Sequence, residues 1–363
     1  MCRRRRACRR TRERPGGTRA DQRPRGRRGT REASMPGRPD ALLDVVVAVH
    51  DGARHLPTFV ASARRNLVPG IRFVVVDDAS SDQTPQLLAR AARELPLEVL
   101  RNPENRGVAA SRNRALDAAD ARYVTFVDAD DWCAPGHLPA MLAAVERTGA
   151  AMVRTDHVRV DGLRREAERA PWDGPRDVAF AAREGIGDAG GRALVDYPYL
   201  WAAAFDRERV EPRLLRFHED LRTAADRPWF WRLHLTDLTC AVVDSPGYFY
   251  RRSAGSGSLT QAGADRLLDF LLAYDRVLDL ALADGDPAVE RRALYGACRI
   301  VDFHVSRRHR LSRALQRRLL AGAAALLARG GDDAFEVAVQ GAPAGGRRLL
   351  RGLRATGRAA GAA

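Results

Sequence analysis

The stretch TFVDADDW at residues 125–132 places three acids directly after a short apolar run. The run Tyr123–Val127 has the length and composition of a strand that is buried on both faces. Helix capping, a common role for Asp, accounts poorly for both Asp128 and Asp130. Alternating carboxylates instead suit Mg²⁺ or Mn²⁺, which prefer oxygen ligands and share them with substrate phosphates. The stretch therefore predicts a strand end that carries a divalent metal site.

The chain before this stretch alternates β-branched runs with amphipathic segments. Strands are expected at Asp44–Val49, Ile71–Val76, Glu98–Leu100 and Tyr123–Val127. Helices are expected between them, from Leu56 to Leu67, from an N-cap at Thr84 through Leu95, and over Ala109–Ala118. This order predicts a parallel sheet with helices on both faces, whose sites lie at the carboxyl ends of the strands. Asp77 and Asp78 end the second strand, so they join the candidate site.

Four segments, taken in this order, resemble the nucleotide-binding half of family-2 glycosyltransferases. They are the apolar first strand, VVVDDASSDQT at 74–84, NPENRGVAASRN at 102–113 and TFVDADDW at 125–132. The resemblance covers about 110 residues and implies the GT-A fold, a mixed and mainly parallel sheet flanked by helices. One departure is Ala48-Val49-His50-Asp51, where many relatives carry Pro-x-Tyr-Asn. The contacts to the nucleotide base are therefore expected to differ in shape there.

The resemblance also implies roles for individual residues. Asp78 would accept a hydrogen bond from the base of a uridine-type donor, with Asp77 beside it. Arg106 would contact the nucleotide, and its charge suits a diphosphate; a solvated surface charge is the alternative. Asp130 would bind the Mn²⁺ or Mg²⁺ directly, and Asp128 would contact the ribose or a metal-bound water.

Inverting sugar transfer needs a general base for the acceptor hydroxyl. The segment FHEDLRTAADRPWFWRLHL at 217–235 contains Glu219 and Asp220, which match an acidic pair that opens a helix in relatives. We predict Asp220 as the base, with Asp226 as the alternative because Leu221–Ala225 are inserted between them. Helix capping by Asp220 is a third interpretation. The three aromatics Trp229–Trp231 are expected in the core.

The segment YFYRRSAGSGSLTQ at 248–261 places two arginines before a Gly/Ser loop. Tyr248–Tyr250 is predicted to be an edge strand. Arg251, Arg252 and 256–258 are suited to closing over the diphosphate of the donor, and a plain linker is the equal alternative. His50, His137, His218 and His234 have no ligand spacing and are assigned structural roles.

Composition separates the chain into three parts. Residues 1–40 carry 15 Arg against 4 acids and are predicted to be disordered. One interpretation is an arm that binds nucleic acid or an anionic membrane. The other is that translation starts at Met35, so that the residues before it are not part of the protein. Residues 41–255 would be the GT-A domain and 256–363 a helical region. That region would hold helices at 264–282, 288–305 and 311–328 and a loose tail after Gly341.

The bulk composition also limits the function classes. All 61 basic residues are Arg, which indicates coding bias, so the net charge of +15 does not by itself imply a nucleic-acid partner. The five cysteines, at 2, 8, 133, 240 and 298, have no metal spacing and suggest reduced cytoplasmic thiols. No apolar stretch reaches the roughly 18 residues of a transmembrane helix. The chain is therefore expected in the cytoplasm, with peripheral binding to the inner face of the membrane as an open alternative.

Together these features predict a metal-dependent inverting glycosyltransferase of the hexosyl- or N-acetylhexosaminyl-transferase type. Its donor would be a nucleoside diphosphate sugar, UDP-linked by resemblance. Its acceptor would be a hydroxyl on a glycan, a polyol-phosphate polymer or a lipid-linked precursor of the cell envelope. The alternatives are a nucleotidyltransferase, which His50–Ala53 supports poorly for lack of glycines, and a nucleic-acid-binding protein that uses the Arg-rich arm. A dinucleotide-binding domain is disfavoured, because no GxGxxG follows the first strand.

Overall fold

A computed structural model describes residues 41–252, 265–342 and 344–362. These residues belong to one compact unit of the chain. The predictions for the Arg-rich segment 1–40 and for the loop 256–258 lie outside the described residues.

An eight-stranded sheet forms the centre of the fold, in the order β3-β2-β1-β4-β10-β6-β11-β9. Its strands are β1 (Leu43–Val49), β2 (Ile71–Asp77), β3 (Leu97–Arg101), β4 (Tyr123–Phe126), β6 (Met152–Thr155), β9 (Phe180–Ala181), β10 (Ala203–Asp206) and β11 (Thr239–Val243). Neighbours run parallel except where β10 pairs with β4 and β6, and where β9 pairs with β11. The sheet is therefore mixed and mainly parallel, as predicted.

The register of the parallel strands brings the candidate acids to one edge of the sheet. Val49, the last residue of β1, pairs with Asp77 at the end of β2. On the other side of β1, Val46 pairs with Phe126 at the end of β4. The β-branched residues of β1 and β2 are buried on both faces, so they hold this register through the core. Acids that follow β2 and β4 therefore lie at the same edge of the sheet.

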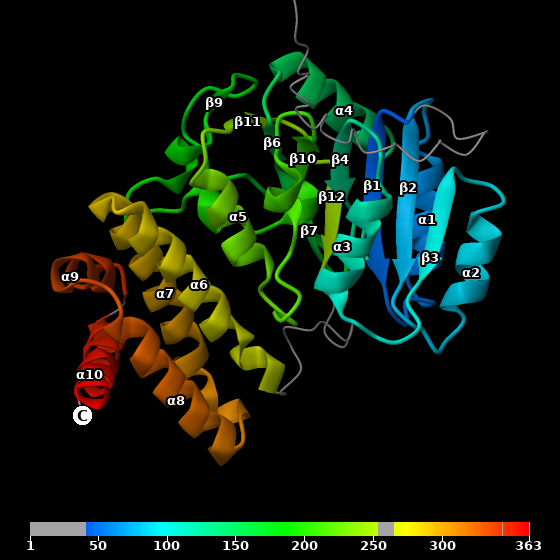
Figure 1. The fold of residues 1–363 in the computed structure, drawn as a ribbon. Coiled ribbons are helices and arrows are strands. Elements are labelled where there is room, and N and C mark those ends of the chain that lie inside the picture. Colours follow the sequence, from blue (N-terminus) through cyan, green and yellow to red (C-terminus); the bar gives the residue numbers. More distant parts are fainter. Residues whose placement is uncertain (1–40, 253–264, 343, 363) are drawn as a thin grey trace, which may run out of the picture. The chain divides into compact units, whose positions relative to one another are not determined.

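Helices cover both faces of this sheet, with α3 in front of it and α1 behind it in Figure 1. The helices of this part are α1 (Leu56–Arg64), α2 (Thr84–Ala91), α3 (Val108–Ala118), α4 (His137–Thr148) and α5 (Asp226–His234), with short 3₁₀ turns η1 (Ala182–Ile186), η2 (Leu194–Asp196), η3 (Leu200–Ala202) and η4 (Pro212–Leu215). The predicted N-cap at Thr84 is wrong. Asp82 accepts the Thr84 backbone N–H at 2.8 Å, and the Thr84 hydroxyl instead accepts the Gly52 N–H at 2.8 Å.

A buried ion pair ties β1 to β2. The Asp44 carboxylate accepts two hydrogen bonds of 2.8 Å from Arg72, and both side chains are almost fully buried. It also accepts the backbone N–H groups of Asp120 and Ala121, at 2.8 and 2.9 Å. One carboxylate therefore satisfies several buried donors at the start of the sheet.

We expect Asp44→Ala to lower the free energy of unfolding by about 3 kcal/mol, because the buried Arg72 guanidinium keeps only its pairing with Asp120 and Glu98, and two N–H groups lose their acceptor. Chemical denaturation measures the change. Glu94→Ala is the matched control, since it breaks the half-exposed Arg64–Glu94 pair and should cost less than about 1 kcal/mol. Equal losses in the two variants would contradict the role of Asp44.

A second, four-stranded sheet has the order β5-β12-β7-β8. Its strands are β5 (Trp132–Cys133), β7 (His157–Asp161), β8 (Arg164–Glu168) and β12 (Tyr248–Arg251). The predicted edge strand at Tyr248–Tyr250 is in fact internal, because Tyr248 pairs with Cys133 on one side and Phe249 with Val158 on the other. This pairing places β12 beside the turn that carries the three acids.

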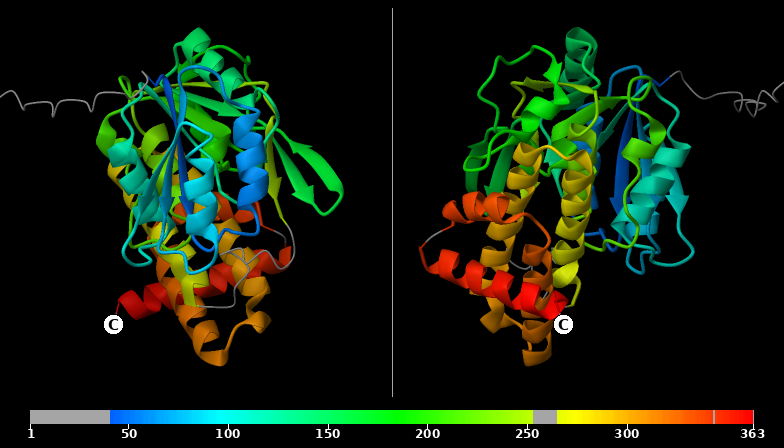
Figure 2. Two further views of the ribbon diagram at one scale, coloured as in Figure 1. Left: turned by 90° about the vertical axis from the view of Figure 1, so that its right-hand side faces the viewer. Right: turned by 60° about the vertical axis from the view of Figure 1, so that its left-hand side comes forward.

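The C-terminal region is helical, as predicted, and it holds more helices than the sequence indicated. It consists of η5 (Asp265–Leu268), α6 (Asp269–Asp284), α7 (Pro287–Ser306), η6 (Arg308–Arg310), α8 (Arg313–Ala328), α9 (Asp332–Gln340) and α10 (Ala344–Gly361). The three predicted helices correspond to α6, α7 and α8. The predicted loose tail is wrong: Figure 2 shows α10, in red, crossing α8, in orange. Small residues permit the close approach, since a Cβ on Gly357 would lie 2.1 Å from the Ala324 carbonyl oxygen.

The described residues form two hydrophobic cores. One surrounds the large sheet, and the other joins α6–α10. Trp231 of α5 belongs to the second core, together with Ile186 and Val195 from the part of the chain before it. The division at 255/256 falls within 253–264 and stays a prediction. None of the described helices is long and apolar enough to cross a membrane.

Candidate active site

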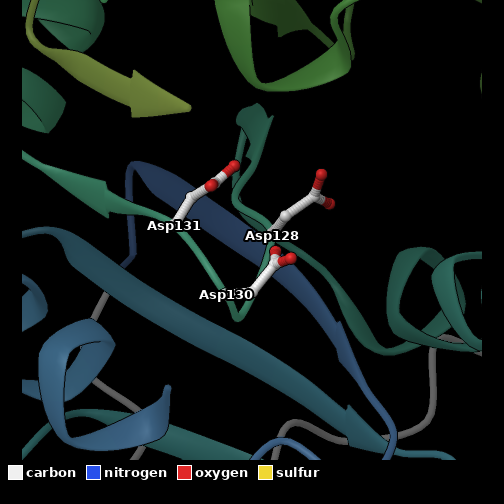
Figure 3. A group of neighbouring side chains, drawn as sticks. All are labelled: Asp128, Asp130 and Asp131. Atoms are coloured by element: carbon white, nitrogen blue, oxygen red, sulfur yellow. The ribbon is translucent and has the colours of Figure 1, made fainter. Parts of the chain in front are cut away.

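Three acids lie on the turn between β4 and β5 (Figure 3). One carboxylate oxygen from each of Asp128, Asp130 and Asp131 lies within 4.8 Å of the others. Asp131 is buried, and it accepts the Tyr248 hydroxyl at 2.8 Å and the Arg251 backbone N–H at 2.7 Å. Asp131 therefore fastens the turn to β12, while Asp128 and Asp130 remain for a ligand.

Crowding of these carboxylates perturbs their ionisation. Burial, with the nearby charge of Asp128, raises the pKa of Asp130 to about 6. Burial, with the charges of Asp130 and Asp128, raises the pKa of Asp131 well above its usual range. A divalent cation would offset this repulsion, and oxygen donors are the ligands that Mg²⁺ and Mn²⁺ prefer. The residues present therefore fit the predicted metal.

Arg112 is a site residue that sequence analysis missed. It lies one turn into α3, and its Nη2 is 2.7 Å from Asp128 Oδ1. Only 13% of its side chain is exposed, and its guanidinium lies 5.7 Å from the centre of the Phe217 ring. Within the segment 102–113 the sequence predicts a role only for Arg106, although Arg112 is the arginine that contacts the acid turn.

The two acids that end β2 organise the neighbouring loops. Asp77 accepts the Ser80 N–H at 3.0 Å and pairs with Arg101 at 2.7 Å. Asp78 accepts hydrogen bonds from the Asn102 amide and from the backbone N–H groups of Arg106 and Gly107, at 2.6, 2.9 and 2.8 Å. Both carboxylates are buried. Their contact with a nucleotide base stays a prediction.

The loop after β1, where the sequence departs from the family pattern, is tied to the β2 loop. Asp51 has a φ of 47°, and its N–H donates to the Ser80 hydroxyl at 2.9 Å. Its carboxylate accepts the Ser81 N–H at 2.7 Å. His50 lies against the backbone of Asp78, with Nδ1 2.8 Å from the carbonyl oxygen. These contacts fix the shape of the loops at the sheet edge where the nucleotide base is predicted to bind.

Arg106 and Glu219 lie together and form an ion pair. Arg106 Nη2 is 3.3 Å from Glu219 Oε2, and half of the Arg106 side chain is exposed. Glu219 also accepts the Asn113 amide at 2.9 Å. Glu219 therefore links the 217–220 segment to α3 and orients Arg106.

The two arginines at the end of β12 lie beside the acid turn. Arg251 donates from Nε to the Asp130 carbonyl oxygen at 2.8 Å, and its guanidinium lies 4.7 Å from the centre of a Trp132 ring. Arg252 is exposed and lines the same cavity as Arg251 and Asp128. Their charges are placed where a diphosphate held at the acid turn would lie.

A cavity of about 860 Å³ opens beside Asp128. Its walls include Arg112, three aromatic residues of the GT-A part, and residues from α6, α7 and α8. The aromatics are Tyr199, Trp201 and Tyr250; Tyr199 and Trp201 stack with ring centres 4.7 Å apart. The cavity volume lies within the range of small-molecule sites, and its aromatic side chains are typical of such linings.

The structure separates the two candidate bases. Asp220 is not among the residues that line the cavity; its half-exposed carboxylate pairs with Arg276 of α6. Asp226 lines the cavity as the first residue of α5. Burial raises the pKa of Asp226, while the charges of Arg227 and Arg112 oppose this. Asp226 thus faces the same cavity as Asp128, and Asp220 does not.

The reason for this difference is where the helix begins. The expected helix start at Glu219–Asp220 is wrong, because Asp269 of α6 accepts the backbone N–H groups of Arg222 and Thr223, at 3.0 and 3.3 Å. Ala224 then adopts a φ of 58°. The chain cannot be helical through this segment, and α5 starts at Asp226 instead.

The remaining aromatic and histidine predictions concern the core. Trp229, Phe230 and Trp231 are fully buried, which confirms the expectation. His137 and His234 are buried, and burial lowers the pKa of each to about 4. Both are therefore neutral packing residues. Cys133, Cys240 and Cys298 are free and buried.

Comparison with known proteins agrees with this geometry. Residues 44–197 match the family model of glycosyl transferase family 2. The chain is 29% identical over 299 residues to the succinoglycan biosynthesis protein ExoO of Rhizobium meliloti. This alignment covers 78% of the chain and 81% of ExoO. It is 34% identical over 211 residues to the poly(ribitol-phosphate) beta-N-acetylglucosaminyltransferase TarS of Staphylococcus aureus, over 57% of this chain and 35% of TarS.

The fold is also that of a solved relative. A crystal structure of S. aureus TarS 1–349 in complex with UDP superposes with a TM-score of 0.65 at 18% identity, and covers 87% of each chain. The same TarS segment with UDP-GlcNAc gives a TM-score of 0.64. The acid turn, the mixed sheet and these matches lead to one conclusion: residues 44–197 form a glycosyltransferase domain of the type described by glycosyl transferase family 2, in a chain that is similar to glycosyltransferases.

Proposed function

We propose that the protein transfers a sugar from a nucleoside diphosphate sugar to an acceptor hydroxyl, with inversion at the anomeric carbon. The observation that carries the proposal is that Asp128, beside Asp130 on the acid turn, and Asp226 line one cavity from different elements. Inversion needs a leaving diphosphate held on one side of the sugar and a base on the other. Carboxylates that line one cavity from two different elements support that arrangement.

Asp128 and Asp130 would hold Mn²⁺ or Mg²⁺, which supplies charge stabilisation to the departing diphosphate. Arg251 and Arg252 would bind the diphosphate from β12, since guanidinium groups pair well with phosphate oxygens. Arg112 holds Asp128 in place through its 2.7 Å contact. Asp77, Asp78 and Arg106 would form the nucleotide end of the site, where buried acids already shape the loops.

Asp226 would accept the proton of the acceptor hydroxyl as its oxygen attacks the anomeric carbon. A carboxylate whose pKa is raised by burial is a stronger base than one in water, provided that it remains ionised at the working pH. The charges of Arg227 and Arg112 favour the ionised form of Asp226. We therefore assign the base to Asp226 and leave Asp220 in its surface ion pair with Arg276.

The donor proposed is a UDP-sugar, because TarS, whose fold the chain shares, is solved with UDP and with UDP-GlcNAc. The acceptor proposed is a growing envelope polysaccharide or polyol-phosphate polymer. ExoO is named for succinoglycan biosynthesis and TarS for a poly(ribitol-phosphate) acceptor. Cytoplasmic action, where nucleotide sugars are made, is part of the same proposal.

A donor panel tests this proposal. We expect hydrolysis of one UDP-sugar to rise with Mn²⁺ and to return to background with EDTA, measured as release of UDP. Conversion of a UDP-sugar and added pyrophosphate to UTP and the sugar 1-phosphate would instead indicate a nucleotidyltransferase. Absence of metal-stimulated release from every sugar nucleotide would reject the transferase assignment of the site.

A further inference from the structure

A second cavity of about 270 Å³ adjoins the first, because Arg227, Tyr274, Ile300 and Phe303 line both. It extends the site away from the acid turn, between the segment around Arg192 and helix α7. We call the part of the two cavities that is lined by Arg227, by helix α7 and by the residues Arg307 and Arg310 after it the distal groove.

The lining of this space has an unusual charge balance. Residues 41–363 hold 46 arginines and 42 acids, so the chain after its first 40 residues is close to neutral. The lining of the two cavities holds nine arginines and only three acids. The arginines are Arg112, Arg192, Arg227, Arg251, Arg252, Arg292, Arg299, Arg307 and Arg310, and the acids are Asp128, Asp196 and Asp226. General arginine richness therefore does not explain the excess.

Several of these arginines already have structural partners. Arg112 pairs with Asp128, Arg192 with Glu168, and Arg292 with Asp196. In contrast, Arg227, Arg299, Arg307 and Arg310 form no ion pair with an acid in the described part of the chain. Arg292 also keeps a buried Nε without a hydrogen-bond partner among the described residues. The distal groove thus has unmatched positive charge.

The position of these arginines fits binding along the groove. Arg299 and Phe303 are four residues apart on α7, so they lie on one face of that helix, and Arg307 follows as its C-cap. Arg310 follows in η6, and Arg227 stands next to the proposed base. The row of positive charges therefore begins at Arg227, next to Asp226, and continues along the C-terminal helices. Arg251 and Arg252, the proposed ligands of the donor diphosphate, line the first cavity and not the second.

We propose that the acceptor is an anionic polymer, whose repeating phosphodiester or carboxylate groups bind Arg227, Arg299, Arg307 and Arg310 in the distal groove. This inference rests on the proposed transfer reaction and specifies its acceptor class. Guanidinium groups pair with both phosphate and carboxylate through charge-assisted hydrogen bonds. Aromatic residues of the first cavity receive the sugar or polyol that carries the attacking hydroxyl.

Binding of labelled oligomers to the full chain tests the proposal. The probes are a ribitol-phosphate hexamer, hexagalacturonate and neutral maltohexaose, measured by fluorescence anisotropy at 50 and 500 mM NaCl. We expect at least one anionic probe to bind about tenfold or more tightly than the neutral one, and to weaken at the higher salt. Comparison of the two anionic probes distinguishes a phosphodiester polymer from a uronate glycan.

A pair of double variants locates the binding. Arg299→Gln/Arg310→Gln removes one charge from each cavity and should weaken the anionic probe about tenfold or more. Arg317→Gln/Arg318→Gln is the matched control, since both residues are exposed on α8 outside the lining, and it should change affinity less than about twofold. Circular dichroism and thermal unfolding check that each double variant is folded.

Three results would overturn the inference: binding of no probe, equal binding of neutral and anionic probes, or equal losses in the two double variants. Metal-stimulated donor hydrolysis by the unmodified chain is measured on the same preparation. Hydrolysis without selective anionic binding rejects the acceptor class alone. Selective binding without hydrolysis rejects the transfer reaction alone.

Discussion

Asp226→Asn is expected to reduce sugar transfer by about 10³-fold, because a general base typically contributes about 10²–10⁴-fold. The amide has nearly the same shape as the carboxylate but cannot accept the proton of the acceptor hydroxyl. Asp226 lines the cavity beside Asp128 and Arg112 and begins helix α5. Transfer is measured with the donor found in the panel and an acceptor oligomer, and UDP affinity is measured by calorimetry.

Asp220→Asn is the matched control, since it makes the same chemical change in a residue outside the cavity. Asp220 pairs with Arg276 on the surface, with 54% of its side chain exposed, so transfer should remain within about threefold of the unmodified chain. UDP affinity should be near normal in both variants. The opposite pattern, with transfer lost in Asp220→Asn and kept in Asp226→Asn, would return the base to Asp220.

Asp130→Ala is expected to lower metal-stimulated donor hydrolysis by about 100-fold or more, since the cation contributes several kcal/mol of charge stabilisation at about 1.4 kcal/mol per tenfold in rate. Mn²⁺ affinity, measured by calorimetry with UDP present, should fall in parallel. Stability should not fall, because Asp130 is crowded by Asp128 and its removal relieves repulsion. Removal of the Asp131 carboxylate should instead lower stability, since Asp131 accepts hydrogen bonds from the Tyr248 hydroxyl and the Arg251 N–H.

Asp161→Ala controls for the loss of one negative charge, since Asp161 is an exposed acid at the end of β7. We expect its Mn²⁺ affinity and hydrolysis to match those of the unmodified chain. If Asp130→Ala retained full Mn²⁺ affinity while losing activity, the acid would act on the substrate directly, and the assigned metal role would be rejected.

Most of the GT-A sheet was predictable because its signals are local. Runs such as Val45–Val47 and Val74–Val76 are apolar on both faces, which identifies buried parallel strands without reference to the rest of the chain. The acids after β2 and β4 follow from the same reasoning, because the ends of neighbouring parallel strands share an edge. The acid turn was therefore placed correctly by sequence alone.

The errors arose where distant residues control local structure. Asp269 of α6 binds the backbone at Arg222 and Thr223 and so delays the start of α5, which a local pattern cannot reveal. The internal position of β12 depends on pairing with β5, which is far away in sequence. The role of Arg112 depends on a contact across the sheet edge to Asp128. The prediction of a loose segment after Gly341 is wrong because Gly and Ala residues allow close packing of helices as well as irregular chain.

Helix α5 is held between two cores: Trp229 is packed in the core of the large sheet, Trp231 in that of the C-terminal helices, and Asp226 begins the same helix. A chimera that exchanges only 265–362 for the helices of a relative would leave Trp231 against foreign side chains and tilt the carboxylate at the head of its helix. Engineers who wish to graft a new acceptor preference onto this catalytic half should therefore transplant α5 together with the helices that follow it.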